Sequence, residues 1–201
     1  MSEELTVYLL RHGETDMNAD GNRYCGITDA ILTENGIKQA LEAGKLLAGE
    51  DIAALFASPL LRSRRTAELL GLSLPVEVDE RLIEMNFGSW EGKTREEFIA
   101  EDPESWRKWN EDPEVNPAGG DGDTAKAVTD RLKDFFDEKF REYKGKSIVV
   151  VGHNGINRLY LSCMLGMPAR NYRSILQENS CVTRFVLSDG EGFQLQKLNC
   201  R

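Results

Sequence analysis

Short apolar runs alternate along this 201-residue chain with segments of helical periodicity, and this alternation constrains the fold most strongly. Runs at 7–10, 52–57 and 147–151 have the length and composition of buried strands. Each run adjoins an amphipathic segment with apolar residues at helical spacing. Strands that alternate with helices usually form a largely parallel sheet covered on both faces. We therefore expect an α/β fold of three layers, α/β/α, with a largely parallel central sheet.

Capping residues indicate where the first two long helices begin. Thr33 is a candidate N-cap for a helix whose apolar face is formed by Ile37, Ala40, Leu41 and Leu47. After the second run, Ser58 and Pro59 predict a capping residue and a first helical position, with the helix ending near Leu70 and Gly71.

The second half of the chain predicts further elements of both kinds. A helix is expected over 124–143 before the third apolar run, and another after it, from Ile156 to Cys163, closed by Gly166 and Pro168. Strands are expected over 181–187 and 193–198, on either side of a glycine-rich turn.

The segment at about 92–122 interrupts the alternation. It holds Trp106 and Trp109 together with three prolines and many acidic residues. This composition predicts a helical lid insertion within a single domain spanning 1–201, with the two tryptophans serving as packing groups.

Charge and composition exclude several protein classes. The chain has 25 basic against 34 acidic residues, a net charge of -9, which disfavours binding to nucleic acid. Its longest apolar run, 52–57, is too short to cross a membrane. The acidic start at 1–4 does not resemble a secretory signal, so we expect a cytoplasmic protein. The four cysteines lack metal or redox spacing and are expected to be free thiols, mostly in the core.

The two histidines of the chain, His12 and His153, occupy equivalent places. Each lies just past a predicted core strand and next to a glycine. The carboxyl ends of parallel strands share one edge of a sheet, where ligands of α/β proteins bind. We therefore expect both imidazoles at an active site; the alternative is a pair of neutral histidines that only satisfy loop hydrogen bonds.

Arginines near these histidines indicate a phosphate ligand. Arg11 adjoins His12, and Arg62, Arg64 and Arg65 fall in the first turns of the helix after the second strand. Guanidinium groups match phosphate oxygens, and the amino end of a helix also favours an anion. A neutral histidine can attack phosphorus without a metal, provided that cations and a proton donor are close.

Glu84 is the candidate proton donor. It lies in a segment with apolar neighbours, which would raise the pKa of its carboxyl group. The alternative is a solvated loop carboxylate.

Four motifs in order resemble the histidine phosphatase superfamily, the phosphoglycerate mutase-like family, along the whole chain. They are Leu10-Arg11-His12-Gly13-Glu14-Thr15 with Asn18, Ser58-Pro59-Leu60-Leu61-Arg62, the segment 84–92, and the segment 149–155. The resemblance implies that His12 is a nucleophile forming a phosphohistidine and that Glu84 is its acid and base. It further implies a phosphate clamp of Arg11, Arg62 and His153, and phosphate or substrate contacts from Asn18, Cys25, Gly26, Arg64 and Asn154.

Some positions depart from the family pattern. Asn154 stands where glycine or alanine is common, which predicts an additional polar contact with substrate, and Cys25 replaces a frequent glutamine. The segment 119–124 lacks the usual Gly-Gly-Glu-Ser sequence, so a lid contact from it is not expected.

Three functions are compatible with these residues. The leading one is hydrolysis of small phosphorylated metabolites such as α-ribazole 5′-phosphate or sugar phosphates, with no cofactor and no metal. The second is a phosphoglycerate mutase, which would need a 2,3-bisphosphoglycerate primer. The third is a phospho-ligand binding protein without catalysis. The expected partner is a small phosphorylated metabolite, and a homodimer is compatible with the sequence.

Overall fold

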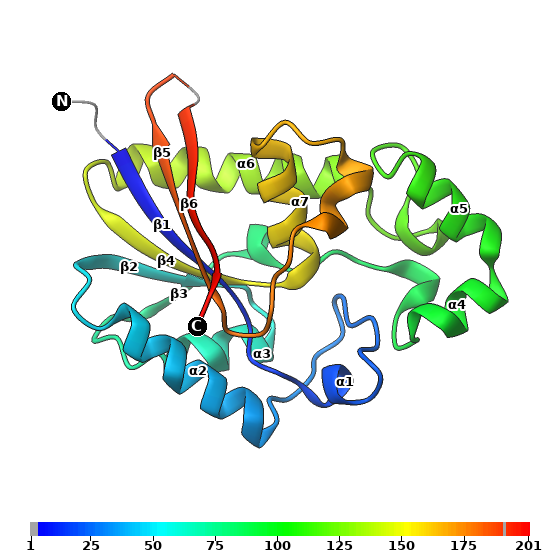
Figure 1. Ribbon diagram of the computed structural model, residues 1–201, viewed down its shortest axis with the longest axis horizontal. Coiled ribbons are helices and arrows are strands. Elements are labelled where there is room, and N and C mark those ends of the chain that lie inside the picture. The colour runs from blue at the N-terminus through cyan, green and yellow to red at the C-terminus, as the bar shows by residue number, and fades with distance from the viewer. Residues whose placement is uncertain (1–3, 191) are drawn as a thin grey trace.

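The computed structural model describes residues 4–190 and 192–201 and contains one six-stranded sheet (Figure 1). In spatial order its strands are β3 (Val76–Val78), β2 (Ile52–Ala57), β4 (Ser147–Gly152), β1 (Glu4–Arg11), β5 (Val182–Ser188) and β6 (Gly192–Cys200). The first four strands are mutually parallel, whereas β5 and β6 are antiparallel to their neighbours. The expected largely parallel sheet is confirmed.

Helices cover both faces of the sheet. The α-helices are α1 (Asp16–Ala19), α2 (Glu34–Leu47), α3 (Leu61–Leu69), α4 (Arg95–Glu101), α5 (Pro103–Glu111), α6 (Ala125–Glu142) and α7 (Asn154–Met164). Short 3-10 helices are η1 (Glu80–Leu82), η2 (Gly88–Trp90), η3 (Ala118–Gly120) and η4 (Ala169–Ser174). The helices α2 and α3 pack on one face, and α6 and α7 pack on the other, as expected for three layers.

Alternation of side chains along β1 explains why both faces are covered. Leu5, Val7 and Leu9 join the core beneath α6 and α7, while Tyr8 and Leu10 join the core beneath α2 and α3. Since successive strand residues point to opposite faces, a continuous apolar run requires a layer on each side.

Two helix predictions need correction. The helix α2 is capped by Thr33 as expected, but Leu41 is exposed, and the buried face consists largely of small residues that allow close packing. The helix α3 starts at Leu61, not at Pro59: the hydroxyl of Ser58 accepts from the amide of Leu60, which forms a turn before the helix begins. The short edge strand β3 was not predicted, because it has only three residues, two of which, Glu77 and Val78, are exposed.

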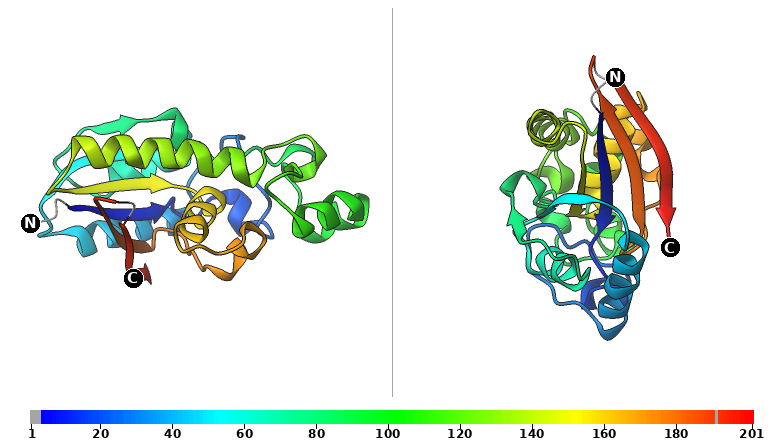
Figure 2. Two further views of the ribbon diagram at one scale, coloured as in Figure 1. Left: turned by 90° about the horizontal axis from the view of Figure 1, so that it is seen from above. Right: turned by 90° about the vertical axis from the view of Figure 1, so that its left-hand side faces the viewer.

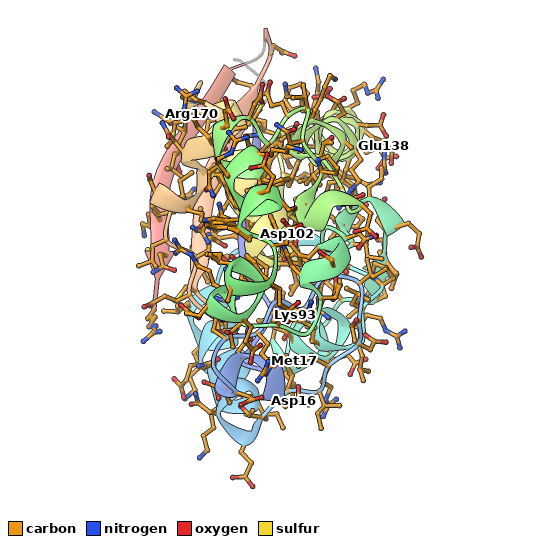
Figure 3. The ribbon with its side chains drawn as sticks, turned by 90° about the vertical axis from the view of Figure 1, so that its right-hand side faces the viewer. Asp16, Met17, Lys93, Asp102, Glu138 and Arg170 are labelled. Carbon is orange, nitrogen blue, oxygen red and sulfur yellow. The ribbon has the colours of Figure 1, made fainter. Side chains whose placement is uncertain are left out.

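The segment 92–122 contains α4 and α5, which project beyond one end of the sheet (Figure 2). Trp109 is buried and packs edge-on against Trp90, while Trp106 is partly buried against Phe98. These contacts agree with a packing role for the two tryptophans. Figure 3 looks onto this end of the molecule, with Asp102, which links α4 to α5, near the centre of the view.

The cysteine prediction is half right. All four thiols are free, but only Cys181 is buried, and Cys25, Cys163 and Cys200 are partly exposed because they lie on a loop, near a helix end and on an edge strand. Within the described ranges, no helix is long and apolar enough to cross a membrane. Residues 1–3, which support the expectation of a cytoplasmic location, and position 191 in the predicted glycine-rich turn lie outside the described residues.

Candidate active site

The parallel pairing of β1 with β4 brings the two histidines together. Arg11 lies opposite Gly152 in this pair, so His12 and His153 follow from adjacent strand ends. Their ring centroids are 5.2 Å apart, with the rings tilted by 58°. Both side chains are buried. The predicted meeting of the two imidazoles at one edge of the sheet is therefore found in the structure.

His12 is held in one tautomer. Its Nδ1 atom lies 2.7 Å from the carbonyl oxygen of Gly13. Because a carbonyl can only accept, Nδ1 must carry the hydrogen, which leaves a lone pair on Nε2. Burial, together with the positive charges of Arg62 and Arg11, holds the pKa of His12 well below its usual value. The ring is thus neutral, as a nucleophile requires.

Arg62 fixes the opposite tautomer in His153. From its buried position on α3, its Nε donates to Nδ1 of His153 at 3.2 Å. The accepting Nδ1 carries no hydrogen, so the proton of the neutral ring resides on Nε2, and this buried atom has no partner within the described residues. Burial also keeps the pKa of His153 well below its usual value. The unpaired Nε2–H of His153, which lies beside the neutral ring of His12, can donate a hydrogen bond to an anionic ligand.

The rest of the Arg62 guanidinium braces the loop after α1. Its Nη1 donates to the carbonyl of Thr28 at 2.7 Å, and its Nη2 donates to those of Gly26 and Cys25 at 2.7 and 3.1 Å. Arg62 therefore contributes a positive charge and holds this loop against the site.

Arg11 is a second buried cation beside the histidines. Its Nη1 donates to the carbonyl of Gln177 at 3.1 Å, whereas its Nε has no partner within the described part of the chain. Burial lowers the pKa of Arg11 to about 10, partly offset by Glu84. It is still protonated at neutral pH and retains donor capacity for a ligand.

Glu84 is buried at the amino end of α7. Its Oε2 accepts from the amide of Gly155 at 2.9 Å, and its Oε1 accepts from those of Ile156 and Met85 at 3.1 and 2.9 Å. Burial raises the pKa of Glu84 above its usual value, although these hydrogen bonds and Arg62 oppose the shift. With 3% of its surface exposed, Glu84 is not a solvated loop carboxylate.

The loop that holds Glu84 is braced by the segment 119–124. Asp123 accepts from the amide of Asn86 at 2.9 Å, and Asp121 accepts from that of Ser89 at 3.1 Å. In this segment, where the sequence departs from the family pattern, the two aspartates therefore hold the Glu84 loop in place.

Arg11, His12 and Glu84 line a cleft of about 510 Å³, whereas the buried His153 and Arg62 do not line it themselves. Asn18, Cys25 and Asn154, which were predicted to contact substrate, line this cleft together with His12, Arg11 and Glu84. Gly26 lies behind it, with its carbonyl on Arg62. Arg64 is exposed on α3 and does not line the cleft, so its predicted contact with substrate finds no support. The helix places it on the solvent side, two residues from the buried Arg62.

Asn179 was missed by the sequence analysis. Its side-chain amide donates to the carbonyl of His12 at 3.0 Å and to Oδ1 of Asn18 at 3.2 Å. It ties the nucleophile's backbone to the cleft wall, from a loop 167 residues further along the chain. No local pattern marks such a residue.

Other cleft residues were also missed, namely Tyr24, Arg95, Arg158, Tyr172 and Arg173. For Arg158 a signal existed, because residues four apart share a helix face and Asn154 precedes it on α7. Across residues 4–190 and 192–201, no group of three histidine, cysteine or acidic side chains could hold a metal ion.

Comparison with known proteins places these features in a family. The model of the histidine phosphatase superfamily (branch 1) matches residues 7–201. The chain belongs to this superfamily. An adenosylcobalamin/alpha-ribazole phosphatase of Escherichia coli is 35% identical over 82% of this chain and 81% of its own.

Two further similar proteins are phosphatases. Phosphoserine phosphatase 1 of Hydrogenobacter thermophilus is 32% identical over 87% of this chain and 82% of its own. The solved structure of a mycobacterial glucosyl-3-phosphoglycerate phosphatase has a TM-score of 0.85 and 28% identity, covering 99% of this chain and 100% of that one. The histidine phosphatase family and these relatives support a phosphatase acting on small phosphorylated metabolites.

Proposed function

We propose that this chain hydrolyses small phosphomonoesters through a phosphohistidine on His12, without a metal. The observation that carries the proposal is the state of His12, a buried neutral imidazole whose Nδ1 is tied to Gly13 and whose Nε2 is left as a nucleophile. Around it lie a buried acid, Glu84, and two unpaired donors, Nε of Arg11 and Nε2 of His153, among the described residues.

In the first step, Nε2 of His12 attacks phosphorus and the bond to the leaving oxygen breaks. The protonated carboxyl of Glu84 gives its proton to that oxygen, so a neutral alcohol departs. Arg11, His153 and the charge of Arg62 stabilise the three equatorial phosphoryl oxygens, over which the charge is spread in the transition state.

In the second step, water attacks the phosphohistidine. The Glu84 carboxylate takes a proton from the water, the phosphorus–nitrogen bond breaks, and inorganic phosphate leaves with His12 neutral again. Burial raises the pKa of Glu84, which favours the protonated form needed in the first step, and the carboxylate left behind takes up a proton in the second.

The relatives suggest the substrates to test. We include α-ribazole 5′-phosphate, sugar phosphates, phosphoserine and 3-phosphoglycerate, because the similar proteins carry related names. We further propose that α4 and α5 form a lid over the cleft, since Arg95 of α4 lines it.

We expect phosphate release from at least one of these substrates with EDTA present. Release should fall in His12→Ala to below about 1% of the wild-type rate, since no second histidine lines the cleft among the described residues. An acid-labile, alkali-stable label from a 32P substrate should appear in the wild type and not in the variant. Arg141→Gln, an exposed change on α6, is the control. Release that depends on metal or survives in His12→Ala would contradict the proposal, whereas turnover seen only with 2,3-bisphosphoglycerate would indicate a mutase.

A further inference from the structure

Besides Arg11, three arginines of the cleft have no carboxylate partner. Arg95 on α4, Arg158 on α7 and Arg173 in η4 line the same cleft as His12, yet none forms an ion pair within residues 4–190 and 192–201. By contrast Arg23, also in the cleft, pairs with Asp20 and Glu97. The cleft thus concentrates positive charge in a chain whose net charge is -9.

Aromatic rings hold these guanidinium groups close to one another. Arg158 and Arg173 both lie over the ring of Tyr172, at 5.3 and 4.6 Å from its centroid. Arg173 and Arg95 both lie over Trp106, at 4.6 and 4.9 Å. Stacking fixes the planes of the guanidinium groups and shields them on one side, and it adds no negative charge to offset their mutual repulsion.

The same groups retain free donors. Nη2 of Arg173 is buried without a hydrogen-bond partner among the described residues. Arg158 uses Nε on the carbonyl of Tyr172 at 3.3 Å and Nη1 on Asn154 at 3.5 Å. Burial lowers the pKa of Arg158, and Arg173 adds to this through its charge. Unpaired donors and crowded positive charge are both relieved by an anion, which a guanidinium group binds through two parallel hydrogen bonds.

The geometry connects this cluster to the reacting centre. Arg158 lies one turn along α7 from Asn154, whose neighbour Gly155 donates to Glu84. The cleft that contains both the cluster and His12 has a volume of about 510 Å³, which suits one small metabolite. A small phosphomonoester held at His12 has its other end in the same cleft as these three arginines.

From these observations we infer that Arg158 and Arg173, with Arg95, form a second anion site, which binds a carboxylate or second phosphate of the substrate. The inference rests on the proposed function, because it assumes that the first phosphate lies at His12. It predicts that the preferred substrate has two anionic groups. A phosphomonoester without a second anionic group, such as α-ribazole 5′-phosphate, is then a poor substrate.

Pairs of substrates that differ in one group test this directly. We would compare 3-phosphoglycerate with glycerol 3-phosphate, in which a hydroxymethyl group replaces the carboxylate. Fructose 1,6-bisphosphate against fructose 6-phosphate tests a second phosphate instead. The proteins are the wild type, Arg158→Gln, Arg173→Gln and Arg158→Lys, with Arg141→Gln as a control that removes one positive charge far from the cleft.

In the wild type we expect kcat/KM to favour the doubly anionic member of one pair by about tenfold or more, the range of one charge-assisted contact. Arg158→Gln and Arg173→Gln should reduce this ratio about tenfold while leaving kcat/KM for the singly anionic member within about threefold. Arg158→Lys should restore part of the ratio, and Arg141→Gln should leave it unchanged.

Binding separates this inference from the proposed function. Calorimetry on His12→Ala measures the affinity for 3-phosphoglycerate and glycerol 3-phosphate, and for the fructose phosphates, without any turnover. If no substrate is hydrolysed but the doubly anionic ligand still binds more tightly and loses this advantage in Arg158→Gln, the proposed function fails and the anion site stands. If both members of each pair bind and react equally well, and the arginine variants change nothing, the anion site is overturned while hydrolysis stands.

Discussion

Burial lowers the pKa values of the two histidines and raises that of Glu84, which suits a neutral nucleophile on one side and a proton donor on the other. Loss of solvent disfavours whichever form is charged, so it keeps His12 and His153 neutral and raises the pKa of Glu84. One enclosed site thereby holds a neutral nucleophile beside a carboxyl group whose protonated form is favoured by burial. In water the same three side chains would keep their usual pKa values, because no burial penalty would act on their charged forms.

At this scale we expect Glu84→Gln to separate substrates by their leaving groups. Glutamine keeps the shape of the side chain but cannot transfer a proton, so hydrolysis of an alkyl phosphate should fall by about 10²- to 10⁴-fold. Hydrolysis of p-nitrophenyl phosphate, whose leaving group needs no proton, should fall far less in pre-steady-state formation of the phosphoenzyme. Glu68→Gln, an exposed change on α3, is the control. Equal losses on both substrates would show that Glu84 is not the acid.

Among the elements, the contact of α2 with the loop after β1 positions the nucleophile. A Cβ atom on Gly36 would lie 2.1 Å from the carbonyl oxygen of Glu14, and one on Gly13 would lie 2.5 Å from that of Gly36. The carbonyl of Gly13 is the group that holds Nδ1 of His12. The first turn of α2 therefore supports the nucleophile through a backbone contact that has no space for a side chain.

Two alanine substitutions on α2 should distinguish stability from positioning. Gly44 approaches α3 as closely, since its Cβ would lie 2.2 Å from the carbonyl oxygen of Leu70, but it lies two turns from the site. We expect Gly36→Ala and Gly44→Ala each to lower the free energy of unfolding by about 1–3 kcal/mol in urea titrations. Only Gly36→Ala should also reduce kcat, measured well below its unfolding temperature. Similar kcat values in both variants would argue against a positioning role for this contact.

The whole molecule encloses its titratable site, and this couples folding to pH. In the folded state the pKa values of His12 and His153 are well below the usual 6.5, so below that pH the unfolded chain binds protons that the folded chain does not. The contribution of these two groups to stability is complete above about pH 7 and is lost as the pH falls. Glu84 acts in the opposite sense above the usual pKa of glutamate, because its folded-state pKa is raised.

We therefore expect the free energy of unfolding to fall between pH 7 and pH 5. In His153→Asn the slope between pH 5 and 6 should be smaller by about 1 kcal/mol per pH unit, the linkage contribution of one histidine. Urea denaturation at several pH values measures both slopes. Parallel curves for the two proteins would indicate that His153 titrates normally in the folded state.

The sequence by itself determined five of the six strands, the helices α2, α6 and α7, and the meeting of His12 with His153. Apolar periodicity defines a strand locally, and the rule for parallel strands then places whatever follows them at one edge. The structure pairs Arg11 with Gly152, so the two strands end side by side and the histidines that follow them lie together.

Only the tertiary structure decided the rest. The start of α3 depends on a turn at Ser58, and the outward direction of Arg64 follows from that start. Glu84 is buried because the distant amides of α7 surround it, and Arg173 reaches the cleft by stacking on Trp106. Such contacts join residues far apart in the chain. Local patterns contain no information on them, because solvent exclusion and donor geometry arise only when the layers pack together.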